Sequence, residues 1–207
     1  ERFLDRVVTR EVTKCKLHQV LYTPWCDADG KVMDDGTLTR LTDDSFRLTS
    51  AEPNLRWLLD NALGMDVSIR DITDDLAALA LQGPTARRIL HHAADAVADD
   101  LGFFRHTTGE IGGVPVEITR TGYTGDLGYE IWTERGNAEA LWDGIMEAGD
   151  AQGAAPWLGY IQQMAKWDED NDTVAALKGL QENRVSLDTA RPIILRGMLD
   201  WYAGQIR

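Results

Sequence analysis

A glycine-rich turn between two strand-like segments restricts the fold of this chain more than any other feature of its sequence. Three glycines, Gly122, Gly125 and Gly128, occur within seven residues, and residues 114–120 and 129–132 on either side have the composition of β-strands. Glycine tolerates positive φ angles and lets the backbone approach a ligand closely. The segment lacks the Gly-Lys-Ser/Thr ending of a phosphate-binding loop. A plain hairpin and a ligand-binding turn are therefore the two interpretations.

Hydrophobic spacing predicts strands and helices before and after this turn. Further strands are expected over residues 19–23, 31–33, 37–41, 46–50, 67–72 and 76–81. Helices are expected over residues 4–12, 53–63, 85–97 and 137–148. This order predicts an α+β fold, a split βαβ (ferredoxin-like) antiparallel sheet with helices on one face. Residues 157–207 have no strand pattern, so we expect a helical C-terminal segment there.

The charge balance argues against several kinds of partner. The formal net charge of -13 repels phosphate backbones and anionic headgroups, so we expect no nucleic acid and no membrane surface as partners. No apolar run is long enough to cross a bilayer and the N-terminus has no secretion-signal pattern, so we expect a cytoplasmic protein. Cys15 and Cys26 are the only cysteines, and the histidines are not spaced as metal ligands. We therefore expect neither a disulfide scaffold nor a metal site.

Two adjacent carboxylates, Asp34 and Asp35, occur between apolar strand residues. Asp is uncommon in strands, and successive strand side chains point to opposite faces, so one of the pair should face inward. An inward Asp is costly unless it is hydrogen-bonded or paired with a cation. Two interpretations stay open: the pair caps backbone amides at a turn or strand end, or it contains a functional carboxylate.

Three elements of the sequence are specific in combination: the Asp-Asp pair, Gln82-Gly83-Pro84, and the run Thr121–Ile131 with its Thr-Gly-Tyr-Thr-Gly and Gly-Tyr-Glu motifs. Further segments in the same order are Arg2–Leu4, Val8–Val12, Tyr22 and Phe46–Leu48. Together they resemble the aminomethyltransferase family, the T-protein of the glycine cleavage system. The resemblance implies a folate-binding region over residues 1–156 and leaves the tail, 157–207, outside the family.

The resemblance further implies tetrahydrofolate-dependent one-carbon transfer. It places Asp34 beside the reactive nitrogens of the folate as the catalytic residue, and it places Tyr123 and Glu130 against the pterin. An aromatic face suits a flat heterocycle and a carboxylate accepts paired N–H donors, so the chemistry of these two side chains agrees. Tyr22 is a further candidate for the folate pocket, with core packing as its alternative. A lipoyl carrier protein is the implied partner if the donor is an aminomethyl group.

Differences from the family leave the reaction open. Pro24–Cys26 and Gly36-Thr37 depart from the usual T-protein, which favours a folate-dependent demethylase of small methyl compounds. The family's N-terminal segment, its Arg-bearing helix after Pro156 and its C-terminal β-barrel have no counterpart in this sequence. A non-catalytic folate-binding module or an inactive fragment is therefore the alternative to an enzyme.

Overall fold

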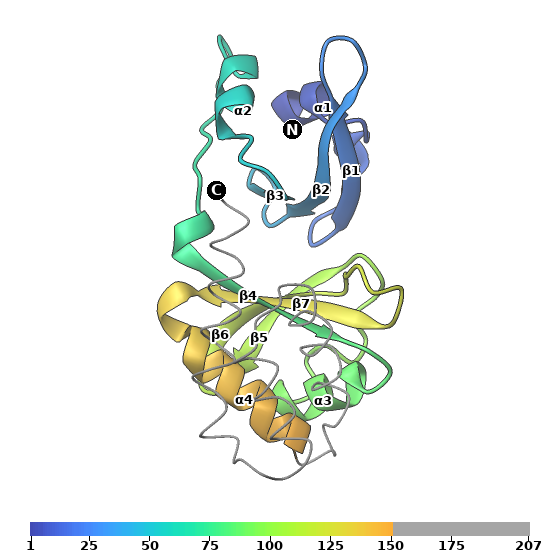
Figure 1. The fold of residues 1–207 in the computed structure, drawn as a ribbon, viewed down its shortest axis with the longest axis vertical. Coiled ribbons are helices and arrows are strands. Elements are labelled where there is room, and N and C mark those ends of the chain that lie inside the picture. The colour runs from blue at the N-terminus through green and yellow to red at the C-terminus, as the bar shows by residue number, and fades with distance from the viewer. Residues whose placement is uncertain (151–207) are drawn as a thin grey trace, which may run out of the picture. The chain divides into compact units, whose positions relative to one another are not determined.

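Three strands in the first third of the chain form one antiparallel sheet (Figure 1). The computed structural model describes residues 1–150. The strands lie in the order β1-β2-β3 and are β1 (Val20–Cys26), β2 (Val32–Arg40) and β3 (Phe46–Ser50). Gly30 adopts a φ of 78° in the turn between β1 and β2. The hairpin expected from the Asp and Gly residues of that turn is thereby confirmed.

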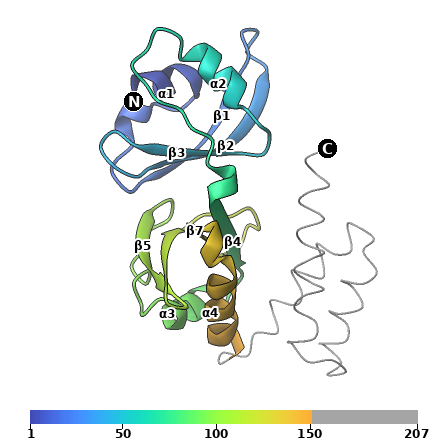
Figure 2. The ribbon, with the colours of Figure 1, turned by 90° about the vertical axis from the view of Figure 1, so that its left-hand side faces the viewer.

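A second antiparallel sheet has four strands in the order β4-β7-β6-β5. The strands are β4 (Leu76–Gln82), β5 (His106–Ile111), β6 (Val114–Thr119) and β7 (Gly128–Glu134). Two helices, α3 (Ala86–Ala93) and α4 (Ala138–Asp150), lie on the same side of this sheet (Figures 1 and 2). The glycine-rich turn connects β6 to β7, as the hairpin interpretation requires.

Short helices complete the described residues. They are α1 (Arg2–Val7), α2 (Leu55–Asn61) and the 3₁₀ turns η1 (Val12–Lys14), η2 (Thr73–Asp75) and η3 (Arg135–Asn137). None of the helices in residues 1–150 combines the length and apolar character that crossing a bilayer requires.

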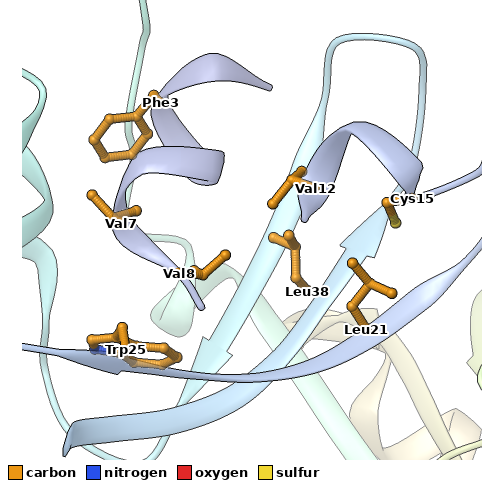
Figure 3. Packing of buried hydrophobic residues seen from close by; sticks show 8 residues of the cluster. All are labelled: Phe3, Val7, Val8, Val12, Cys15, Leu21, Trp25 and Leu38. Atoms are coloured by element: carbon orange, nitrogen blue, oxygen red, sulfur yellow. The ribbon is translucent and has the colours of Figure 1, made fainter. Parts of the chain in front are cut away.

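Apolar side chains from the N-terminal segment and from one face of the first sheet form a core. Figure 3 shows Phe3 and Val7 of α1 on the side of the sheet that carries Trp25 and Leu38, which are both fully buried. The other members are Val8, Val12, Cys15 and Leu21. Because strand side chains alternate, Asp34 of β2 lies on this same covered face.

The two faces of the second sheet differ in chemistry. Tyr129 and Ile131 of β7 are buried on the helix side, together with Ile89 of α3 and Leu141 of α4. Alternation along the strands places the intervening residues on the opposite face. These are Glu117 and Thr119 of β6 with Glu130 and Trp132 of β7. One face is therefore a hydrophobic core and the other carries charged and hydrogen-bonding groups.

The observed topology differs from the split βαβ arrangement. A mixed fold of helices and antiparallel sheets is confirmed, but the strands divide between two sheets instead of forming one. A split βαβ unit needs a helix between its third and fourth strands, whereas β5, β6 and β7 follow one another as direct antiparallel neighbours. The element order alone does not distinguish these arrangements, because it does not say which strands pair.

Single elements also differ from the predictions. Residues 67–72 form no strand, because they connect the two sheets and Ile69 packs against the first core. The strand β5 has the polar sequence His-Thr-Thr-Gly-Glu, which carries no apolar alternation that would predict it. The predicted helices 4–12 and 85–97 end earlier, at Val7 and Ala93. The helices predicted within residues 157–207 lie outside the described residues.

A buried network joins β3 to the polar face of the second sheet. Nη1 of Arg47 lies 3.1 Å from Oε2 of Glu117, and its guanidinium carbon lies 4.7 Å from the centre of the Trp132 ring. Oε2 of Glu117 is also 2.9 Å from Nε2 of His106, whose Nδ1 is 3.1 Å from Nδ1 of His18. The hydrogen bond from His106, followed by the charge of Arg47, lowers the pKa of Glu117 although its burial acts in the opposite direction.

We expect Glu117→Gln to destabilise the protein at neutral pH and to have a smaller effect in acid. Losing the charge leaves a buried Arg without its ion pair and weakens the hydrogen bonds to Arg47 and His106, so the free energy of unfolding should fall by about 2 kcal/mol at pH 7. A carboxyl whose pKa is lowered by folding stabilises above its unfolded value of 4.5, and this contribution is lost as the pH falls below that value.

Urea denaturation of both proteins between pH 7 and pH 3 measures this effect. Glu110→Gln is the matched control, because Glu110 is exposed on β5, and it should leave stability nearly unchanged at every pH. A constant difference between the Glu117→Gln variant and the parent across this range would contradict the prediction.

Candidate functional site

Asp34 lies near the start of β2, opposite Trp25 of β1, and only 8% of it is exposed. Its Oδ1 accepts a hydrogen bond from the backbone N–H of Asp35 (2.7 Å). Its Oδ2 accepts from the backbone N–H of Glu52 (3.0 Å) and from Nδ2 of Asn54 (2.8 Å). A carboxylate has about four acceptor positions, so one on Oδ1 stays available while the group is held in a single orientation. The expected inward Asp with hydrogen-bond partners is therefore confirmed.

Asp35 points to the opposite side of β2. Its Oδ2 accepts a hydrogen bond of 2.8 Å from the hydroxyl of Tyr22 in β1. Tyr22 is 45% exposed, so the core-packing interpretation is wrong and its side chain is accessible. The hydrogen bond to Asp35 raises the pKa of Tyr22, because the carboxylate favours the protonated phenol over the phenolate.

Glu130 lies in β7, between Thr119 of β6 and Ala80 of β4. Its Oε2 accepts a hydrogen bond from the hydroxyl of Thr121, whose Oγ1 is also 2.8 Å from Oγ1 of Thr119. Ala80 is small and exposed, so it leaves the β4 side of Glu130 uncovered by a large side chain. Thr121 thus orients one carboxylate oxygen and leaves the other for a donor from a ligand.

Tyr123 lies in the glycine-rich turn with an exposed side chain. Desolvation of the phenol raises the pKa of Tyr123, and the negative charges of Asp35, Glu130 and Asp34 raise it further. The pKa of Tyr22 is in turn raised slightly by Tyr123. Such effects weaken with distance, so Tyr123 is within electrostatic range of these three carboxylates. Of the four residues that the sequence suggested, Tyr22 and Tyr123 are exposed, Glu130 is half-buried, and Asp34 is buried on the opposite side of β2 from Asp35 and Tyr22.

Three residues that hydrogen-bond to the candidate site residues are not identified by the sequence alone. Asn54 precedes α2 as its N-cap residue, yet its side chain bonds to Asp34 instead of the helix backbone. Asp35 and Thr121 belong to the recognised motifs, but their hydrogen bonds to Tyr22 and Glu130 depend on strand register. Strand alternation is the signal that finds Asp35, since an inward Asp34 implies an outward neighbour. Within residues 1–150, no three His, Cys, Asp or Glu side chains are grouped as a metal site.

Comparison with known families identifies the domain that contains these residues. The model of the GCVT N-terminal domain matches residues 1–162. The chain belongs to this family. Every residue of the candidate site falls within the matched region of this GCVT N-terminal domain.

Curated relatives of this GCVT N-terminal domain are named aminomethyltransferases. The protein from Halothermothrix orenii is 38% identical over 157 residues, which are 74% of this chain and 44% of the relative. The protein from Clostridium botulinum (strain Loch Maree) is 34% identical over 160 residues, 75% of this chain and 43% of the relative. The chain thus spans less than half the length of these curated relatives.

Two solved structures resemble the chain. Glycine cleavage system aminomethyltransferase T from Bartonella henselae has a TM-score of 0.60 and 28% identity, over 70% of this chain and 40% of that one. Heterotetrameric sarcosine oxidase from Corynebacterium sp. U-96 has a TM-score of 0.51 and 22% identity, over 66% of each chain. The second likeness shows a shared fold alone.

We expect Asp35→Asn to lower the pKa of Tyr22 toward its ordinary value of 10.0. A neutral amide oxygen accepts the phenol proton more weakly than a carboxylate, and it no longer repels the phenolate. Carbon-13 NMR titration of labelled tyrosine rings, assigned with Tyr22→Phe, measures the change. Asp43→Asn removes the same charge at the turn between β2 and β3 and should leave Tyr22 as it is. An unaltered Tyr22 titration in the Asp35→Asn variant would show that the hydrogen bond does not persist in solution.

Proposed function

We propose that this chain is the folate-binding part of an enzyme that transfers a one-carbon unit to tetrahydrofolate. What supports the proposal is a domain of the GCVT family that combines exposed Tyr22 and Tyr123 with the hydrogen-bonded carboxylates of Asp34 and Glu130. The relatives that share this domain are named aminomethyltransferases. The composition supports a cytoplasmic enzyme without nucleic-acid or membrane partners, since the chain has a net charge of -13.

The donor and acceptor groups of the site fit a reduced pterin. An aminopyrimidine ring presents adjacent N–H donors, and Glu130 offers a carboxylate with one oxygen already oriented by Thr121. The exposed rings of Tyr22 and Tyr123 can contact a flat heterocycle by their faces. We assign cofactor binding to Tyr123, Glu130 and Tyr22 on these grounds.

Asp34 is the proposed catalytic residue. The chemistry supplied by bound tetrahydrofolate is an amine nitrogen that accepts the one-carbon unit. The carboxylate of Asp34 is held by three donors and keeps an acceptor position on Oδ1, so it can orient and polarise an N–H group without rearranging. Holding the acceptor group in place before the reaction is the contribution that this geometry supports.

The donor of the one-carbon unit has two candidates. A lipoyl carrier protein would bring an aminomethyl group, as the names of the relatives suggest. A small methyl compound would make the protein a demethylase, which the segment Pro24–Cys26 favoured on sequence grounds. Trp25 of that segment is fully buried in the first core, and packing accounts for it without a methyl donor. The relatives are named aminomethyltransferases, and we propose the aminomethyl donor.

Glu130→Gln should weaken binding of tetrahydrofolate to the chain. Replacing a charged acceptor with a neutral amide costs about 1.5 to 3 kcal/mol, which is roughly 10- to 150-fold in Kd. Isothermal titration of the parent and the variant measures this loss. Glu134→Gln, at the exposed end of the same strand, is the matched control and should bind as the parent does. Equal affinity of the two variants would remove Glu130 from the site, and a parent that binds no folate would overturn the proposed function.

Asp34→Asn should leave the Kd for tetrahydrofolate within about threefold and abolish formation of methylenetetrahydrofolate from an aminomethylated lipoyl carrier. The reason is that its proposed task is to polarise the acceptor amine, which an amide does poorly. Asn54→Ala is the control: it removes one donor to the Asp34 carboxylate but keeps the charge, so it should retain part of the rate. If the Asp34→Asn variant turned over as fast as the parent, Asp34 would have no catalytic role. Folate binding without turnover in the parent would favour the non-catalytic module.

A further inference from the structure

The side chain of Gln82 lies inside the glycine-rich turn. Gln82 is the last residue of β4 and pairs with Gly128 at the start of β7. Its Nε2 donates to the backbone carbonyl of Thr121 (3.2 Å) and to that of Tyr129 (3.0 Å). Its Oε1 accepts a hydrogen bond of 3.3 Å from the hydroxyl of Thr124. One amide group therefore binds the turn at its beginning, at its middle and just beyond its end.

Two of the three turn glycines leave room for this amide. A Cβ on Gly128 would lie 1.6 Å from Oε1 of Gln82, and a Cβ on Gly122 would lie 2.1 Å from the same atom. Both distances are far below van der Waals contact. A Cβ on the third glycine, Gly125, would meet no neighbour. Gly125 has a φ of 75°, a backbone conformation that glycine adopts more readily than other residues. Gly122 and Gly128 thus form a space that the Gln82 side chain fills.

The same contacts act on the proposed folate-binding residues. Tyr123 lies between Gly122 and Thr124, the two residues on either side of it that contact Gln82. Thr121, whose carbonyl accepts from Gln82, donates its own hydroxyl to Glu130. Gln82 therefore contacts both residues next to Tyr123. It also contacts Thr121, the residue that orients Glu130.

We propose that Gln82 is a positioning residue, which holds the glycine-rich turn and thereby fixes the position of Tyr123. It acts through Gly122, Gly128 and Thr121 and needs no contact with a ligand. Its importance for folate binding rests on the proposed function, whereas its effect on Tyr123 does not. The two segments Gln82-Gly83-Pro84 and Thr121–Ile131, distant in sequence, are in this way one structural unit.

Gln82→Met tests the proposal, because methionine keeps the length of the side chain but loses its hydrogen bonds. In carbon-13 NMR titration of the tyrosine rings, the raised pKa of Tyr123 should fall toward its ordinary value of 10.0, because a displaced turn exposes the phenol further to water and lessens the effect of Asp35 and Glu130. Tyr22 serves as the internal control, because the pKa of Tyr22 depends first on its hydrogen bond to Asp35. A titration of Tyr123 that is the same in the variant and the parent would overturn the proposal.

A second variant approaches the same contact from the other side. Gly128→Ala should displace the Gln82 amide and change the Tyr123 titration in the same direction, while adding Gly128→Ala to a Gln82→Ala protein should have little further effect. Gly136→Ala is the matched control, since a Cβ there meets no atom within 4 Å. Equal effects of Gly128→Ala in the two backgrounds would overturn the proposed contact. Circular dichroism of each variant identifies any that fail to fold.

Folate binding completes the test. Gln82→Met should weaken tetrahydrofolate binding to the parent protein by about tenfold. In a Tyr123→Ala protein, the same substitution should weaken binding by less than about threefold. Fully additive losses would mean that Gln82 does not act through Tyr123. A parent that binds no folate would overturn the proposed function, and the NMR titration would still decide the role of Gln82.

Discussion

The buried carboxylate of Asp34 is the constraint on which the first half of the site depends. Burying a charge is costly without partners, and the partners here come from the segment after β3, through Glu52 and Asn54. This requirement attaches that segment to β2. It also fixes the face of the sheet on which each side chain of β2 lies. Because Asp34 points inward, Asp35 points outward, where it accepts the hydrogen bond of Tyr22. A single strand therefore contributes one carboxylate to each side of the sheet.

The second half of the site depends on the two-faced character of the four-stranded sheet. Residues such as Ile131 are buried against the helices, whereas Glu130 on the next position faces away. The network of Arg47 and Glu117 then joins this polar face to β3. A buried Arg without its partner would be strongly unfavourable, so the ion pair helps to hold β3 against the polar face that carries Glu130. Folding and the assembly of the site use the same polar groups.

Much of this arrangement could be predicted from the sequence, for physical reasons that differ between residues. Alternation and turn chemistry located the β1–β2 hairpin and the hairpin around Gly122 to Gly128, because both signals are local. Strand period alone predicted that one carboxylate of the Asp-Asp pair faces inward, but it did not say which one. Pairing of strands did not follow, since nothing local tells β7 to lie between β4 and β6. Asn54 was missed for the same reason: its partner, Asp34, is twenty residues away in sequence.

The polar strand β5 has a consequence of its own. Among residues 1–150 it is an outer strand of its sheet, with β6 as its paired neighbour. An outer strand with free backbone groups is a template on which other chains can assemble, and natural proteins reduce this risk with charged or polar side chains at the edge. Exposed Thr108 and Glu110 are of this kind. The composition that conceals β5 from hydrophobic patterning is thus also what keeps the edge of this sheet from acting as a site of aggregation.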